Sequence, residues 1–303
     1  MVMQQNRLQF VESQAAHIEA NARMVQHGSI QYPELVGISR EASPYADVIT
    51  YYSWDGTGDM IDLSNRGNDY PFVQVSQQQH NVNIEWKGLA YDWSDREIGR
   101  AMMTGIPLSD RKVRMAFRIW EEEKDRVFIN GDASKGWDGF VNNSNVPVLT
   151  ALTATFAAST GIEIAEAVNE ALSAVYSSTN QVRIADTLCL PVAQATLMAT
   201  KAIGDDADRN VMSYIRENNI YTQMTGRPLM IRTLRQLDGA GAGGTDRMVA
   251  YSRDMNVLRY HIPQELQFLE PQRRADSWVY YGYGVQAGLE IMEPGAMRYQ
   301  DGI

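Results

Sequence analysis

The stretch SDRKVRMAFRIWEEEKDRVFINGDASKGWDGFVN, residues 109–142, decides the fold. Ser109 can cap a helix, and the apolar residues that follow recur every three or four positions as far as Ile129. Asn130-Gly131 then ends the helix, because glycine is common just beyond a helix C-terminus. The predicted buried stripe of this long helix is Val113, Ala116, Phe117, Trp120 and Val127. Residues 132–158 are predicted to form turns and short strands.

Charged residues cover the rest of the long helix. Arg118–Glu122 and Glu122–Arg126 have the spacing of ion pairs on one helical face, each contributing about 0.2–0.5 kcal/mol. The acidic run Glu121-Glu122-Glu123 is predicted to be a solvated face, and a catalytic carboxylate pair there is disfavoured.

Before the long helix the pattern is that of β-structure. Residues 47–54 are rich in β-branched and aromatic side chains, 55–59 and 64–69 are turn-like, and strands are predicted over 70–75 and 82–86. Together 47–88 reads as a long hairpin with a polar, glycine-rich tip and few large apolar residues near it. Such a hairpin is marginal alone and needs a surface to lie on. Ser94 then opens a short helix over 94–104.

The chain begins with an amphipathic pattern over residues 4–26, where apolar residues follow a 3-4-3-4-3 spacing. Its apolar stripe must find a partner, either on the same domain or on another subunit. Residues 31–46, with Pro33, Gly37 and Pro44, have the composition of a linker.

After the long helix, helical and strand patterns alternate. Thr160 and Glu163 fit a capping box. The helix that they open is predicted to bury Ile164, Val168, Ala171, Leu172 and Val175. Further helices are predicted to begin at Pro191 and to cover 209–218. Strands are predicted over 186–190, 228–234, 246–252, 257–262, 266–269, 278–285 and 289–292. The fold class is therefore α+β.

Composition excludes several classes of protein. The 303 residues are 44% hydrophobic and 21% charged, which is typical of a folded chain with a sizeable core. No stretch approaches 18 consecutive apolar residues, and the polar N-terminus does not resemble a signal peptide, so we expect no membrane span and a cytoplasmic site of synthesis and assembly. A net charge of −10 with few lysines disfavours sequence-specific nucleic-acid binding. An acidic wall around nucleic acid remains compatible with this charge.

Residues that carry chemistry in other proteins form no convincing site. Cys189 lies in an apolar run and is predicted to be buried. The four histidines, His17, His27, His80 and His261, have no metal-ligand spacing, and Asp205, Asp206 and Asp208 lack that of a calcium loop. The stretch 239–244 matches G-x-G-x-x-G but precedes a strand-like run, so a surface loop is favoured over a dinucleotide site. We predict no catalytic, cofactor-binding or metal-binding residues.

The order of the predicted elements resembles the Hong-Kong-ninety-seven-type capsid fold of tailed bacteriophages, which encapsulin shells share. Three stretches carry the resemblance: the passage from the long helix through 127–142, the strand-to-helix step Asp186–Pro191, and the ending Gly288–Tyr299. In that family an N-terminal arm and an extended loop reach neighbouring subunits, a peripheral domain surrounds a long spine helix, and an axial domain gathers at the symmetry axes.

The resemblance implies a division of this chain. Residues 1–46 would be the N-terminal arm, 47–88 the extended loop, 89–145 with 256–303 the peripheral domain, and 146–255 the axial domain. The final strands would return to the peripheral domain, and 239–244 would be an axial-domain loop. Some relatives weld subunits through a lysine near the loop tip. Residues 47–86 contain no lysine, so we expect non-covalent contacts here.

The function that the resemblance implies is that of a structural major capsid protein, not an enzyme. Copies would assemble through pentamers and hexamers into an icosahedral shell, the capsid of the virion, around double-stranded DNA that is bound without sequence specificity. Scaffolding, portal and decoration proteins would be further partners, and because the chain starts with the arm, scaffolding is expected to be a separate protein. The alternatives are an encapsulin-type compartment, a tail or decoration protein, and an enzyme with an unrecognised site.

Overall fold

The structure is a computed structural model that describes residues 28–62, 70–104, 111–204 and 208–303. The chain divides between Ile30 and Gln31, and residues Gln31–Ile303 form one compact unit. The helix predicted over residues 4–26 lies outside the described residues. The remaining predicted elements fall within the larger unit, which is described below.

The long helix is present as α4, Arg111–Asn130. Ala116, Trp120 and Val127 of the predicted stripe are buried, whereas Phe117 is 45% exposed and was wrongly placed in the core. Its ring forms an edge-to-face pair with the ring of Phe268, with the two centroids 5.6 Å apart.

The helix ends in a tight glycine turn. Gly131 has φ +72°, and a Cβ atom there would lie 2.2 Å from the carbonyl oxygen of Trp137. Asn142 holds the turn, since its Oδ1 accepts the Gly139 N–H at 2.8 Å and its Nδ2 donates to the Asn130 carbonyl at 3.1 Å. The short strands β4 (Gly131–Asp132) and β5 (Trp137–Asp138) pair across the turn, in agreement with the turns and short strands predicted to follow the helix.

A five-stranded antiparallel sheet lies against α4. It runs β10-β12-β3-β2, with β11 paired to β12. Its strands are β2 (Val48–Thr57), β3 (Gln74–Ser94), β10 (Gln264–Phe268), β11 (Gln272–Arg274) and β12 (Ser277–Ala287). Gly284 lets α4 approach closely, because a Cβ atom there would lie 2.7 Å from the Trp120 ring.

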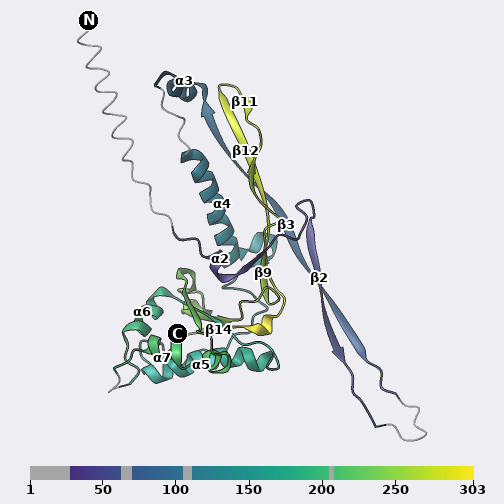
Figure 1. The fold of residues 1–303 in the computed structure, drawn as a ribbon, viewed down its shortest axis with the longest axis vertical. Helices are drawn as coiled ribbons and strands as arrows, with labels where there is room; N and C mark the ends of the chain where they lie inside the picture. The colour runs from purple at the N-terminus through teal and green to yellow at the C-terminus, as the bar shows by residue number, and fades with distance from the viewer. Residues whose placement is uncertain (1–27, 63–69, 105–110, 205–207) are drawn as a thin grey trace. The chain divides into compact units, whose positions relative to one another are not determined.

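Strand β3 differs from the prediction of separate strands at 70–75 and 82–86. It is one strand of 21 residues. Its first half pairs with β2 and its second half with β12, so the polar run between the predicted strands is held by backbone bonds rather than by burial (Figure 1). It leads directly into α3, Asp95–Thr104. Ser94 and Glu97 form reciprocal hydrogen bonds that confirm the predicted start of that helix.

A second layer contains α5 (Gly161–Ser178), α6 (Val192–Thr200), α7 (Val211–Glu217) and α8 (Ile220–Thr225). Its sheet runs β14-β8-β6-β7, with β6 at Thr187–Leu190, β7 at Met230–Thr233, β8 at Arg247–Tyr251 and β14 at Met297–Asp301 (Figure 1). The capping box of Thr160 and Glu163 is confirmed. The five predicted core residues of α5 are all buried against this sheet.

Two predictions for the chain ends need correction. The segment 31–46 is not only a linker, because it contains α2 (Tyr32–Leu35) and β1 (Gly37–Ser39). Strand β1 pairs in parallel with β9 (Leu258–His261), which also pairs with β13 (Leu289–Ile291). The last strand, β14, pairs with β8 in the α5 layer instead of returning to the sheet beside α4.

Candidate assembly surfaces

The β2–β3 ladder has little packing of its own. Ten register pairs join Val48–Thr57 to Gln74–Asn83. Most side chains of this ladder are exposed, but Ile49 and Val82 at its base are half-buried and pack against the cluster of Ile84, Val285 and Ala287. Tyr51 and His80 stack with ring centroids 4.8 Å apart, and Ser53 bonds His80. A two-stranded ribbon that is largely uncovered is marginal in water. Beyond its packed base, the hairpin is therefore a surface that the described residues of the larger unit leave mostly exposed.

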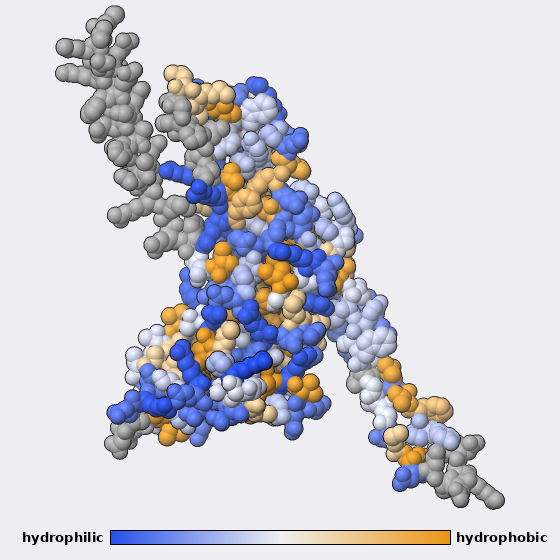
Figure 2. Space-filling view, viewed as in Figure 1, coloured by the Kyte–Doolittle hydropathy of each residue, from blue (hydrophilic) through white to orange (hydrophobic). Residues whose placement is uncertain are grey.

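The hairpin tip was predicted to be polar and poor in large apolar residues, but it is more apolar than that. Large side chains on either side of residues 63–69 are exposed, and orange atoms gather at this end of the hairpin in Figure 2. They are Met60, Ile61, Tyr70, Phe72 and Val73. Phe72 is 87% exposed. Contiguous exposed apolar residues on a soluble chain mark contact surfaces.

A buried polar anchor holds the segment after residue 30 on α4. Asp125 Oδ1 accepts the backbone N–H groups of Gln31 at 2.8 Å and Tyr32 at 2.9 Å, so a side chain from α4 caps the N-terminus of α2. The Tyr32 hydroxyl donates to Glu121 at 2.8 Å. Burial is the main cause that raises the pKa of Tyr32 to about 12. Sequence reasoning missed this anchor, because Asp125 and Gln31 lie far apart in the chain.

Lys124 extends the anchor to β10. Its ammonium is buried and bonds Glu121 at 2.6 Å and Glu265 at 2.8 Å. Burial alone would lower the pKa of Lys124, but the hydrogen bonds that Lys124 donates to these two carboxylates, with a contribution from Tyr32, outweigh burial and raise the pKa. Arg40 pairs with Glu265 at 3.2 Å and Trp120 Nε1 donates to it at 2.9 Å.

The acidic run on α4 is not simply a solvated face. Glu123 bonds Arg126 through two contacts of 2.8 Å and also pairs with Lys87 of β3. The pair Arg118–Glu122 is confirmed at 2.8 Å, but Arg126 bonds Glu123 rather than Glu122. The pair of Glu123 with Lys87, like that of Lys124 with Glu265, therefore fastens this helix to the sheet.

The glycine stretch 239–244 is occupied by the protein's own carboxylates. The Gly239 N–H donates to Asp246 at 3.1 Å, and the Ala242 N–H donates to Asp301 at 2.9 Å. Asp301 also forms a buried two-point ion pair with Arg247 at 2.6 and 2.8 Å. Because negatively charged side chains already accept these amides, the loop is not a phosphate cradle.

The other residues considered for chemistry have structural surroundings. His261 is buried and bonds Glu290, which Arg259 also contacts at 2.8 Å; His17 and His27 lie outside the described residues, as do Asp205 and Asp206. Cys189 is buried, and burial raises the pKa of its thiol. Within the part of the chain that the structure describes, no group of three or more His, Cys, Asp or Glu could hold a metal ion. No described helix is long and apolar enough to cross a membrane.

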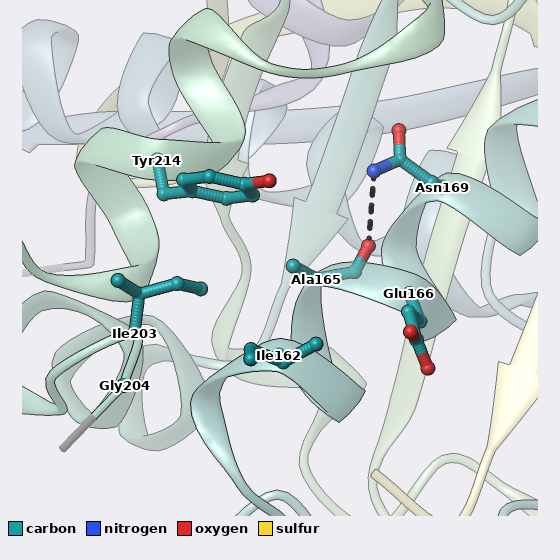
Figure 3. Close-up of a pocket in the computed structure, with 7 residues that line it drawn as sticks. All are labelled: Ile162, Ala165, Glu166, Asn169, Ile203, Gly204 and Tyr214. Atoms are coloured by element: carbon teal, nitrogen blue, oxygen red, sulfur yellow. Dashed lines mark hydrogen bonds between the residues drawn. The ribbon is translucent and has the colours of Figure 1, made fainter.

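A shallow hollow lies between α5 and α7 (Figure 3). Its volume is about 380 Å³, and its lining is Ile162, Ala165, Glu166, Asn169, Ile203, Gly204 and Tyr214. Asn169 Nδ2 already donates to the Ala165 carbonyl at 3.1 Å. The hollow therefore offers a mainly apolar rim, with Ile162 55% exposed, rather than a set of converging catalytic groups.

The fold, with its mostly exposed hairpin and without converging catalytic groups in the hollow described above, is that of a structural protein. A family model described as major capsid protein matches residues 59–303, so the chain belongs to the major capsid protein family. It is thus a structural component of the virion capsid and not an enzyme, and capsid assembly implies self-association. The match favours this class over the encapsulin, tail-protein and enzyme alternatives.

Solved structures support the same fold. The capsid of Myoviridae phage XM1 has a TM-score of 0.76 at 18% identity, with 93% of this chain and 95% of that chain covered. The capsid of an empty GTA particle has a TM-score of 0.61 at 12% identity, with 92% of each chain covered. A structure from Microbacterium phage Oxtober96 has a TM-score of 0.60 at 12% identity, covering 93% and 94%. No protein with a curated description matches the chain.

Proposed function

We propose that copies of this chain assemble through pentamers and hexamers into an icosahedral shell that encloses double-stranded DNA. The observation that carries the proposal is the β2–β3 hairpin, which has a regular backbone ladder, mostly exposed side chains and an apolar tip. Burying one side chain such as Phe72 contributes about 1.5–3 kcal/mol per subunit. Repeated around a closed shell, such contacts offset the entropy lost on association.

The proposed division of labour follows the capsid resemblance. Residues 1–46 act as the arm, 47–88 as the extended loop, 89–145 with 256–303 as the peripheral domain, and 146–255 as the axial domain. We modify one limit: β14 goes with the axial domain, since it pairs with β8 there. The Asp125 anchor supports a fixed origin for the arm at the spine helix.

The test is electron microscopy and sedimentation of the purified full chain. We expect closed shells from the wild type. A Met60→Ser/Phe72→Ser variant should remain folded by circular dichroism but require at least tenfold more protein to assemble, because about 1.4 kcal/mol corresponds to a factor of ten. The matched control is Gln77→Ser/Gln78→Ser, which changes exposed polar residues of the same hairpin.

Two results would count against the proposal. One is a wild-type chain that purifies only as a small discrete oligomer. The other is a tip variant that assembles as well as the control. Assembly of the purified chain without other proteins would also show that it does not need scaffolding. The proposal allows portal and decoration proteins as further partners.

The net charge of −10 suits a wall that does not trap packaged DNA. This part of the proposal is tested by mapping charge on the assembled particle, where a strongly basic inner surface would reject it.

A further inference from the structure

The chain itself supplies hydrogen-bond partners to both edge strands of the second-layer sheet. Along β14, the Leu149 N–H donates to the Tyr299 carbonyl at 2.8 Å, and the Tyr299 N–H donates to the Pro147 carbonyl at 3.1 Å. At β7, Gln31 Nε2 donates to the Thr233 carbonyl at 3.0 Å. Strand β2 differs, because its one strand partner among the described residues is β3.

The ladder pattern shows which backbone groups of β2 point away from β3. The Ile84 N–H donates to the Asp47 carbonyl at 2.9 Å, so residues 47 and 84 form a hydrogen-bonded pair. Hydrogen-bonded and non-hydrogen-bonded pairs alternate in an antiparallel ladder. The outward N–H and C=O groups therefore belong to Val48, Thr50, Tyr52, Trp54 and Gly56. The side chains of this set are exposed, with Tyr52 at 51% and Trp54 at 68%.

The first seven residues of β2 carry none of the features that usually protect an edge. Soluble proteins block open edges with proline, lysine, bulges or short strands. The stretch Val48–Trp54 has no proline and no charge, and its register with β3 is unbroken over ten pairs. Its residues are mostly β-branched or aromatic, which favours strand pairing.

We propose that β2 pairs antiparallel with β2 of a second copy, about a twofold axis at Tyr52. The inference deepens the proposed function and rests on self-assembly. In this register each outward residue faces another: Tyr52 faces its own counterpart, Thr50 faces Trp54, and Val48 faces Gly56. The five pairs form about ten hydrogen bonds, since each bonded pair exchanges two. One surface serves both copies, as a twofold interface requires.

Disulfide trapping tests the register. Hydrogen-bonded antiparallel partners have Cα atoms about 5.5 Å apart, within the range of a disulfide. Oxidised Tyr52→Cys particles should therefore yield dimers on non-reducing gels. Thr50→Cys alone should not, but a mixture of Thr50→Cys and Trp54→Cys should. Native Cys189 is buried and stays outside the reaction. Assembled, folded Tyr52→Cys that gives no dimer, or Thr50→Cys that links to itself, overturns the inference.

Charge exchange at the axis gives a second test. Tyr52→Lys and Tyr52→Glu each place two like charges opposite each other across the axis. Assembly of either variant alone should therefore need at least tenfold more protein than the wild type. An equal mixture of the two variants should restore assembly to near the wild-type concentration. The matched control is Gln79→Lys, which lies opposite Tyr52 on β3 but away from the open edge. Tyr52→Lys that assembles like the control overturns the pairing.

The tests separate this inference from the proposed function. Shells that form without a Tyr52 cross-link support the proposed function and reject the β2 pairing. Tyr52 dimers from a chain that never closes shells support the pairing and reject the proposed function.

Discussion

Individual charged residues of α4 hold the described fold together through contacts that are distant in sequence. Asp125 caps α2, Lys124 joins Glu121 to Glu265, and Glu123 joins Lys87 to Arg126. Burial would ordinarily disfavour these ions, and their partners compensate for the lost water. Residue types alone predicted a charged helix, but not which of its charges would be enclosed.

Glu123 provides a pH test at this scale. The Arg126 guanidinium, helped by Lys87 against partial burial, lowers the pKa of Glu123 from 4.5 to about 2. A carboxyl whose pKa is lowered in the folded state stabilises the fold above its unfolded pKa, and that stabilisation is lost as the proton binds. Between about pH 4.5 and 2, the free energy of unfolding should fall less steeply for Glu123→Gln than for the wild type.

Urea unfolding at a series of pH values measures this difference. Glu122→Gln is the control for removing a charge from the same helix turn. Wild-type and Glu123→Gln curves that run parallel below pH 4.5 would contradict the prediction.

Elements with strong local signals were predicted well. Ser94 with Glu97 and Thr160 with Glu163 opened helices where expected, because a capping box is a short-range pattern. The elements that were missed are short: α2, β1, α8, β11 and β14. Strand β11 pairs with the adjacent β12, whereas the others are held by partners distant in the chain, such as Asn169 for α8 and β8 for β14. None of them is long enough to show a periodic pattern.

Asp125→Ala tests the anchoring of α2. Removing the acceptor of two backbone N–H groups should lower the free energy of unfolding by about 1–3 kcal/mol. Asp125→Asn keeps an oxygen acceptor and should lose less. Trypsin should also cleave after Arg40 faster in Asp125→Ala, since the segment is less firmly held. Equal cleavage in Asp125→Ala and in the control Asp208→Ala, a change at an exposed site, would show that the anchor contributes little.

At the scale of the whole molecule, charge and uncovered surface act in opposite directions on assembly. Each copy carries a net charge of −10, so copies repel one another at long range. The contacts proposed for the hairpin tip and the β2 edge are apolar or backbone hydrogen bonds, which salt screens little. Raising the ionic strength from about 0.01 to 0.15 M shortens the screening length from about 30 to 8 Å and should lower the protein concentration needed for assembly.

Light scattering over a protein titration at each salt concentration measures this effect. Particle size by sedimentation is the control for non-specific aggregation. If added salt instead raised the concentration needed, ion pairs between copies would dominate the interfaces.

The sequence by itself determined the α+β class, the long helix with its glycine turn, the hairpin and the order of elements that resembles a phage capsid protein. These follow from periodicity, caps and turns, which act within a few residues. Only the tertiary structure decided that β3 is continuous, that β14 pairs with β8, that Lys124 and Asp125 of α4 are buried and that β2 pairs with β3 alone among the described strands. Such features depend on which segments, distant in the chain, pack or pair with each other, and the local sequence pattern does not specify those partners.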